Sequence, residues 1–269
     1  MEERVRIEIE AGVADVRLAR ADKMNALDDA MFVALVAAGE RLRNEPGVRA
    51  VVLSGEGRAF CAGLDMGNFG RMAQGGSGGG GTDQGLGART HGPANRAQYA
   101  AWVWRDVPVP VIAAVHGVAF GGGFQVALGP DLRYATPDAR LCVMEIKWGL
   151  VPDMAGTQLM RHLAREDIVR ELTYTGRIFS GEEAFQYGFA TRVCADPYAE
   201  ALASAREIAA KNPDAIRAAK RILNDAVLTD PKTGLTQESV EQGHLIGSPN
   251  QIEAVMANLQ KRAPTFVDP

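Results

Sequence analysis

The order of apolar and polar residues changes period soon after the chain begins. Residues 5–10 and 13–18 alternate apolar and polar side chains around Gly12, which predicts a β-hairpin. Over residues 31–42 the apolar positions recur every three or four residues, which predicts an amphipathic helix. The N-terminal region is therefore expected to be a hairpin followed by a helix.

Two short apolar runs, residues 48–53 and 109–115, have the length and composition of buried parallel strands. Strands that alternate with helices predict an α/β core with right-handed crossovers. From Ala199 onward the pattern is helical and free of strands. We therefore expect an α/β core over residues 1–197 and a helical C-terminal region over 198–269.

A glycine-rich segment interrupts this organisation. Eight of the thirteen residues from 75 to 87 are glycine, and such a segment gains too little on folding to offset its loss of conformational entropy. A phosphate-binding loop needs a preceding strand and a following Gly-Lys-Ser/Thr sequence, and neither is present. We expect a disordered loop here, and the wider segment 67–95 to cover the substrate's tail.

Composition and charge narrow the class of protein. The 269 residues are 46% hydrophobic and 23% charged, with a net charge of −4, which argues against nucleic acid or an anionic membrane as the main partner. The three cysteines form no CxxC pair, which argues against a zinc site and favours a reducing compartment. No apolar stretch reaches the roughly 20 residues needed to cross a bilayer, and residues 1–4 lack a signal-peptide pattern. We expect a cytoplasmic protein.

Two glycine-containing turns follow the predicted strands. The first spans residues 59–65, and the second contains the triplet Gly121, Gly122 and Gly123. Glycine allows the backbone to approach a ligand closely, and two backbone N–H groups aimed at one oxygen form an oxyanion hole. The other reading of such a triplet is a tight turn between a strand and a helix.

The sequence of these turns resembles that of a known family. Residues 58–65 (RAFCAGLD) are similar to the first oxyanion-hole motif of the crotonase (enoyl-CoA hydratase/isomerase) superfamily, and residues 116–123 (HGVAFGGG) resemble the second. Residues 22–27 (DKMNAL) resemble the family's early CoA-contacting turn. The likeness continues through residues 149–158 to the helices that begin near Asn212.

The resemblance implies an α/β fold with a crotonase-like ββα spiral core, whose C-terminal helices pack on neighbouring subunits of a homotrimer or a dimer of trimers. It implies that the backbone amides of Ala62 and Gly122 bind the thioester oxygen of an acyl-CoA as it becomes an enolate. It also implies that Lys23, Gly63, Leu64 and Asp65 line the path of the substrate. A solvated surface lysine is the other reading of Lys23.

Glu145 is the main acid–base candidate. It lies between Met144 and Ile146, and an apolar setting raises the pKa of a carboxyl toward the range of a general base. The family's hydratases carry a second glutamate two residues after the glycine triplet, where this chain has Gln125. A glutamine can position water but cannot exchange a proton, which disfavours hydration and favours double-bond migration.

Asp153 has two readings. It lies eight residues after Glu145, and this spacing resembles that of the dienoyl-CoA isomerase branch, which uses an aspartate there to move protons between distant carbons. The branch also keeps an acid at the position of Gln125, so the match is partial. The alternative is that Asp153 caps the helix predicted from Thr157 onward.

Cys61 adjoins the first glycine turn. Nucleophilic catalysis by a cysteine requires a thiolate and therefore a nearby base, and His91 is a candidate. This reading ranks behind acid–base chemistry.

These residues predict an acyl-CoA hydratase/isomerase that acts on an unsaturated acyl-CoA through an enolate. Isomerisation is favoured, with Glu145 as acid/base, Asp153 as a possible second acid and Gln125 as a positioning residue. Two alternatives stay open: an enoyl-CoA hydratase in which Gln125 positions the water, and a catalytically silent CoA-thioester binder. No metal or redox cofactor is expected, because the thioester itself acidifies the α-carbon.

Overall fold

The computed structural model describes residues 3–76 and 85–269, and a six-stranded sheet runs through its centre. The strands lie in the order β1-β2-β3-β4-β6-β9. β1 pairs antiparallel with β2, whereas the other neighbours in this sheet are parallel. The bounds are β1 Val5–Glu10, β2 Val13–Leu18, β3 Ala50–Gly55, β4 Val111–Val115, β6 Leu132–Ala135 and β9 Arg192–Val193.

A smaller sheet lies beside the ends of these strands. It has the order β5-β7-β8 and consists of β5 Val118–Phe120, β7 Arg140–Cys142 and β8 Phe179–Ser180. Mixed sheets with covering helices confirm the predicted α/β class. The hairpin prediction is confirmed as well, since Val5 pairs with Leu18 and Glu10 with Val13.

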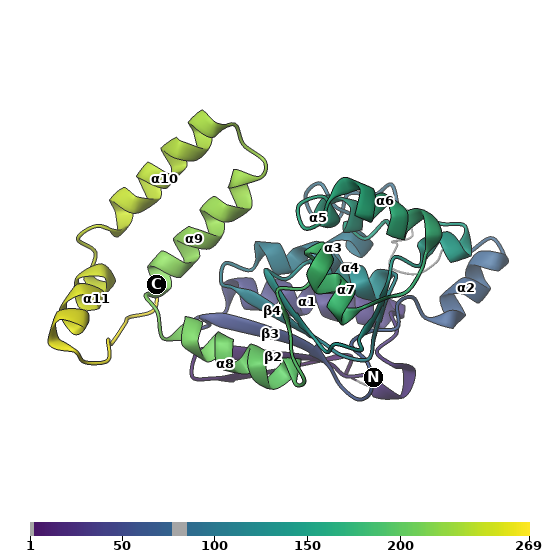
Figure 1. Ribbon diagram of the computed structural model, residues 1–269, viewed down its shortest axis with the longest axis horizontal. Coiled ribbons are helices and arrows are strands. Elements are labelled where there is room, and N and C mark those ends of the chain that lie inside the picture. The colour runs from purple at the N-terminus through teal and green to yellow at the C-terminus, as the bar shows by residue number, and fades with distance from the viewer. Residues whose placement is uncertain (1–2, 77–84) are drawn as a thin grey trace.

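Helices occupy most of the remaining chain (Figure 1). In the first half they are the 3-10 helix η1 Ala21–Lys23, α1 Asp29–Asn44, α2 Met66–Ala73, α3 Arg96–Asp106 and α4 Gly122–Leu128. In the second half they are the 3-10 helix η2 Glu145–Trp148, α5 Gly156–Met160, α6 Glu166–Thr175, α7 Gly181–Tyr187, α8 Pro197–Ala209, α9 Pro213–Ala226, α10 Pro231–Leu245 and α11 Pro249–Gln260. The helix predicted over 31–42 is α1, whose N-cap Asp28 accepts a hydrogen bond from Met31 N–H.

The two faces of the large sheet are covered differently. On one face α1, α3 and α4 pack over the sheet, and side chains such as Val16, Leu53 and Ala113 are fully buried there. On the other face α8 contributes small residues, with Ala201 and Ala205 packed against the sheet. α8 thus belongs to the core, although the sequence pattern assigned residues from 198 onward to the C-terminal region.

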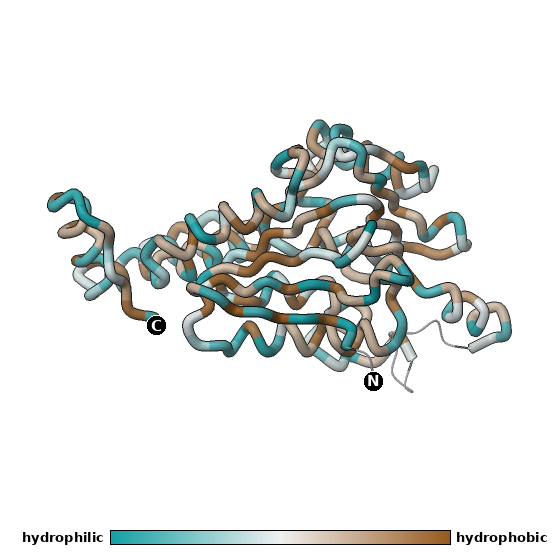
Figure 2. The backbone as a smooth tube through the Cα atoms, turned by 90° about the horizontal axis from the view of Figure 1, so that it is seen from below, coloured by the Kyte–Doolittle hydropathy of each residue, from teal (hydrophilic) through white to brown (hydrophobic). Residues whose placement is uncertain are grey.

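Helices α9, α10 and α11 form an arm that projects from the body (Figure 1). In the second view the last helix and the C-terminus again lie apart from the central strands (Figure 2). The arm is tied to the body near its base, where the Lys220 ammonium donates to Trp104 O, Val109 O and the Asp131 carboxylate. The chain then returns, and Arg49 Nε donates to the Asp268 carboxylate at 2.6 Å.

Two further expectations bear on the described part of the chain. No helix among the described residues is long and apolar enough to cross a bilayer. Of the segment 75–87 that was expected to be disordered, residues 77–84 lie outside the described residues.

Candidate active site

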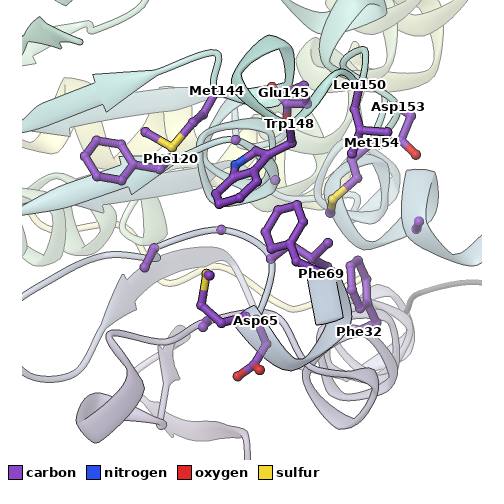
Figure 3. A pocket seen from close by; sticks show the side chains of 18 of the residues that line it. Phe32, Asp65, Phe69, Phe120, Met144, Glu145, Trp148, Leu150, Asp153 and Met154 are labelled. Carbon is purple, nitrogen blue, oxygen red and sulfur yellow. The ribbon is translucent and has the colours of Figure 1, made fainter. Parts of the chain in front are cut away.

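A cavity of about 780 Å³ opens where the end of β5 meets η1, α2, α4 and η2. Figure 3 shows its labelled side chains: Phe69 and Trp148 lie near its middle, Glu145 lies above them, and Asp65 lies below them. The predicted catalytic, oxyanion-hole and substrate-binding residues all line this cavity except Gln125, and the alternative pair Cys61 and His91 does not line it. Gln125 lies directly behind it and is 1% exposed.

The two glycine turns converge, as the two-loop interpretation requires. Cys61 N–H donates to Val118 O at 3.0 Å, and Phe120 N–H donates back to Cys61 O at 3.1 Å. Gly63 lies so close to β5 that a Cβ there would stand 2.4 Å from Phe120 O, and its φ is +88°. Only glycine satisfies both conditions, and the close contact places the first turn against Gly122.

Asn25 holds the first turn from behind. Its side-chain Nδ2 lies within hydrogen-bond distance of three carbonyls, those of residues 56, 59 and 60, at 2.9 to 3.1 Å. Its Oδ1 accepts from Arg20 N–H at 2.9 Å, and the residue is completely buried. Asn25 therefore contributes to the site by fixing the turn that carries Leu64.

The backbone N–H groups of the first turn are not equally available. Ala62 N–H, which was predicted to bind the substrate oxygen, donates instead to Met24 O at 2.9 Å. Leu64 pairs with Leu27 as a parallel bridge in which Leu27 N–H donates to Gly63 O and Asp65 N–H donates to Leu27 O. In such a bridge Leu64's own N–H points away from Leu27, and it has no acceptor among the described residues.

Gly122 supplies a second free donor. Its N–H begins α4 and has no acceptor within the described part of the chain. Gly122 and Leu64 both line the cavity. The free amide of the first turn is thus that of Leu64, and the sequence motif did not identify it. Which amide is free depends on the contact between residues 24–27 and 61–65, which the sequence does not show.

Glu145 is buried at the start of η2, with 8% of its surface exposed. Burial raises its pKa, and the Asp153 carboxyl adds to the rise, whereas the hydrogen bond from Gln125 opposes it. Glu145 Oε1 accepts from Gln125 Nε2 at 2.7 Å. Oε2 is buried and has no partner among the described residues, which makes it the oxygen available for a ligand.

Gln125 joins three segments of the chain. Its Oε1 accepts from Met154 N–H and from Gly156 N–H, each at 2.9 Å, while its Nε2 donates to Glu145. A Cβ at residue 156 would lie 2.5 Å from Gln125 Oε1, so glycine is needed for this approach. Since both lone pairs of the amide oxygen are occupied, the orientation of the amide is determined, and one N–H of Nε2 remains.

Asp153 lines the same cavity as Glu145 and is exposed to solvent. The protein surrounding it raises the pKa of its carboxyl, because burial disfavours the charged form. The capping interpretation is wrong: α5 begins after Ala155, which has a left-handed backbone, and no side chain caps this helix. Asp153 therefore presents a second carboxyl to the cavity.

The opposite side of the cavity is ionic. Arg20 donates to Asp65 at 2.6 Å and to Ala26 O at 3.0 Å. Although burial acts in the other direction, hydrogen bonds from Gly67 N–H and Arg20 hold the pKa of Asp65 below its usual range. Lys23 ends η1 and lines the exposed rim.

Cys61 does not have the properties of a nucleophile. Its thiol is fully buried and donates to Asn25 O, and burial raises its pKa to about 12, which disfavours the thiolate. His91 stacks on Tyr99 and lies 3.8 Å from Glu40, on α1. The predicted alternative of cysteine chemistry therefore has no support from the geometry.

Comparisons with known proteins identify a family of enzymes to which this chain is similar. A family model described as enoyl-CoA hydratase/isomerase matches residues 8–269. The mitochondrial enoyl-CoA hydratase domain-containing protein 2 of Bos taurus is 31% identical over 264 residues, which cover 95% of this chain and 84% of the relative. The mitochondrial methylglutaconyl-CoA hydratase of Mus musculus is 29% identical over 263 residues, with coverage of 95% and 79%.

Solved structures of enoyl-CoA hydratases have a similar fold. The crystal structure of enoyl-CoA hydratase from Bacillus anthracis superimposes with a TM-score of 0.87 at 28% identity and covers 98% of both chains. That of enoyl-CoA hydratase from Mycobacterium smegmatis has a TM-score of 0.81 at 31% identity, with coverage of 98% and 99%.

Proposed function

The chain belongs to the enoyl-CoA hydratase/isomerase family, and we propose that it moves a double bond within an unsaturated acyl-CoA by way of an enolate. The observation that carries this proposal is the hydrogen bonding of Gln125, whose amide joins Glu145 to the 154–156 segment. One carboxylate can remove a proton at one carbon and return it at another. The family's hydratases carry a second proton-exchanging group at the position of Gln125, and a glutamine cannot take that role.

The enolate oxygen is held by the N–H groups of Leu64 and Gly122. Both are free of other acceptors in the described part of the chain and both line the cavity. Donors that are already in place stabilise developing charge without reorganisation, and the loss of one such donor typically costs about 2.7–4 kcal/mol of barrier. Leu64 takes the role first assigned to Ala62, whose N–H is bound to Met24 O.

Glu145 Oε2 carries the proton. Gln125 Nε2 can only donate, so Glu145 Oε1 stays an acceptor and the proton taken from substrate is held on Oε2. The raised pKa of Glu145 makes it a stronger base than an exposed carboxylate and allows it to return the proton near neutral pH. Asp153, also with a raised pKa, is the second acid for transfer to a more distant carbon.

A hydratase is the second candidate. The one free N–H of Gln125 can donate to a water that Glu145 deprotonates. The third candidate, a silent thioester binder, keeps Leu64 and Gly122 but performs no proton transfer.

Parallel assays separate the three. A 3-enoyl-CoA and a crotonyl-type 2-enoyl-CoA are incubated with the protein, and α-proton exchange of a saturated acyl-CoA is followed in D₂O. We expect migration of the double bond in the first substrate to exceed hydration of the second, together with measurable exchange. Faster hydration favours the hydratase, and tight binding without exchange identifies a silent binder.

We also propose that the arm mediates a homotrimer or a dimer of trimers, as the family resemblance implies. Large apolar side chains lie exposed along it, with Leu223 at 68%, Leu235 at 62% and Leu259 at 74% exposure, and such patches typify interfaces. Light scattering coupled to size-exclusion chromatography tests this: a purely monomeric species rules out both assemblies.

The reaction as proposed needs no metal or redox cofactor, because the thioester acidifies the α-carbon and the two amides stabilise the resulting charge. All three cysteines are free thiols, which supports a reducing setting such as the cytoplasm. Activity that survives exhaustive chelation would support the first point.

A further inference from the structure

One side of the cavity is lined by apolar residues that take no part in the proton transfer at Glu145. Phe32 from α1 and Met154 reach it from the protein interior and are only 2% and 4% exposed. Leu150 lies next to Met154 in Figure 3, and Met72 of α2 also lines the wall. Met154 adjoins the proposed oxyanion donor, since a Cβ on Gly122 would stand 2.7 Å from its sulfur. An acyl group held by that donor therefore meets apolar walls at once.

An aromatic pair covers this side. The rings of Phe69 from α2 and Trp148 from η2 stack with their centroids 4.1 Å apart, and Figure 3 shows them in the middle of the cavity. Stacking joins two elements that are distant in sequence and removes apolar surface from water. The rings and the methionine thioethers give polarisable, adaptable contacts to a bulky apolar ligand.

The charges of the cavity are arranged unevenly. On the side of Met154 its charged lining residues are Glu145 and Asp153, both carboxyls. Its cationic lining residues in the described chain, Arg20 and Lys23, belong to the segment that carries the ion pair with Asp65. A carboxylate at the far end of an acyl group would thus be desolvated beside two carboxyls without a cation to pair with.

We propose that this cavity selects an uncharged, apolar acyl group of medium length or with a ring, and that it discriminates against acyl groups ending in a carboxylate. The inference rests on the proposed function, because it takes Leu64 and Gly122 as the anchor for the thioester. Burial of one methylene group typically improves affinity about fourfold. Lengthening the acyl chain within the cavity should therefore have a measurable effect.

Isothermal titration with free CoA and saturated acyl-CoAs, which do not turn over, tests the proposal. We expect octanoyl-CoA to bind at least about tenfold more tightly than butyryl-CoA, and glutaryl-CoA, which ends in a carboxylate, to bind no more tightly than butyryl-CoA. Equal affinities for butyryl- and octanoyl-CoA, or tighter binding of glutaryl-CoA, overturn the inference and leave the proposed function intact. Failure of every CoA compound to bind overturns both.

A charge variant gives a second test. Met72→Lys adds an ammonium to the lining of the cavity and should raise the affinity for glutaryl-CoA relative to octanoyl-CoA at least about tenfold. Val33→Lys is the matched control, because Val33 is half exposed on α1 and does not line the cavity. An unchanged ratio in Met72→Lys, or an equal change in the control, contradicts the proposal.

Discussion

The region around Gln125 and the arm of α9–α11 differ in how their side chains are partnered. Those around Gln125 bind other groups of the same chain, whereas many on the arm are exposed. Around Gln125, polar atoms of α4, η2 and the segment before α5 bind one another, and Gln125, Glu145 and Met154 are buried. Along the arm, large apolar side chains such as Leu223 and Leu259 face solvent. The first region is determined within one chain, whereas the second is suited to contact with another surface. Substitutions in the two regions should therefore change different properties.

The largest effect is expected from Glu145→Gln. It removes the group that exchanges protons but keeps an oxygen that can accept from Gln125 Nε2. Turnover should fall about 10²–10⁴-fold, while the melting temperature and the oligomeric state stay the same. Kinetics, calorimetry and light scattering on the same preparation check this. Retention of turnover would remove Glu145 from the mechanism.

Lys220→Met tests the other side of the comparison. The lysine ammonium joins the base of the arm to Asp131 and to two backbone carbonyls. Its loss leaves a partly buried carboxylate without its cation, and the free energy of unfolding should fall by about 3 kcal/mol. Denaturant unfolding measures the change, and Lys232→Met, at an exposed position on α10, is the control. A loss no greater than that of the control would show that the anchor contributes little.

Gly63→Ala should push the first glycine turn away from the second. A Cβ would clash with Phe120 O, and the positive φ disfavours alanine. We expect turnover to fall about 100-fold as Leu64 N–H leaves its position relative to Gly122. Gly70→Ala, in an exposed helical position with open space around it, is the matched control and should be neutral or slightly stabilising. Equal kinetics in the two variants would contradict the role of the convergence.

Gln125→Glu sharpens the distinction between isomerase and hydratase. The new carboxyl would lie against Glu145 Oε1, where the amide nitrogen now stands at 2.7 Å. Two carboxyls at this distance share a proton and titrate as a pair. We expect hydration of a crotonyl-type substrate to rise about tenfold or more, with a changed pH–rate profile. Unchanged hydration would show that the glutamine does not set the reaction.

Asp153→Asn should give the smallest effect, and one that depends on pH. Burial raises the pKa of Asp153 in the folded protein above its usual value of 3.8, so the folded state binds this proton more tightly than the unfolded chain does. Protonated Asp153 therefore stabilises the folded state. This contribution to the free energy of unfolding is complete below the usual pKa and is lost as pH rises through the raised pKa. Asparagine cannot ionise, so the variant should melt a few degrees higher at pH 7 and show no gain at pH 3. A gain at both pH values would point to a cause other than ionisation.

Elements with a strong local pattern could be predicted from the sequence. The hairpin of β1 and β2 and the helix α1 follow from periodicity, and the strand β4 follows from a short apolar run. Glu145 and Gly122 were located by their motifs. The short strands β5, β7 and β8 have too few residues to show a period. α10 was predicted only as part of the helical region 198–269 and not as a separate helix, since its apolar residues form no buried face.

The details of the site depend on contacts between distant residues. The preference for Leu64 over Ala62 arises from the pairing of the first turn with residues 24–27. The role of Gln125 depends on two amides near residue 155, about thirty positions away. A linear motif identifies which residues meet in the cavity, but not which of their atoms remain free.

The hydrogen bond from Gln125 to Glu145 also provides a spectroscopic reporter. An N–H proton shared with a carboxylate changes its chemical shift when that carboxylate is protonated, and Gln125 is buried with its amide in one orientation. In a ¹⁵N-labelled sample its side-chain signal should follow the titration of Glu145 directly. The protonation state of the reacting group can then be observed in the native protein, without substitution and without turnover.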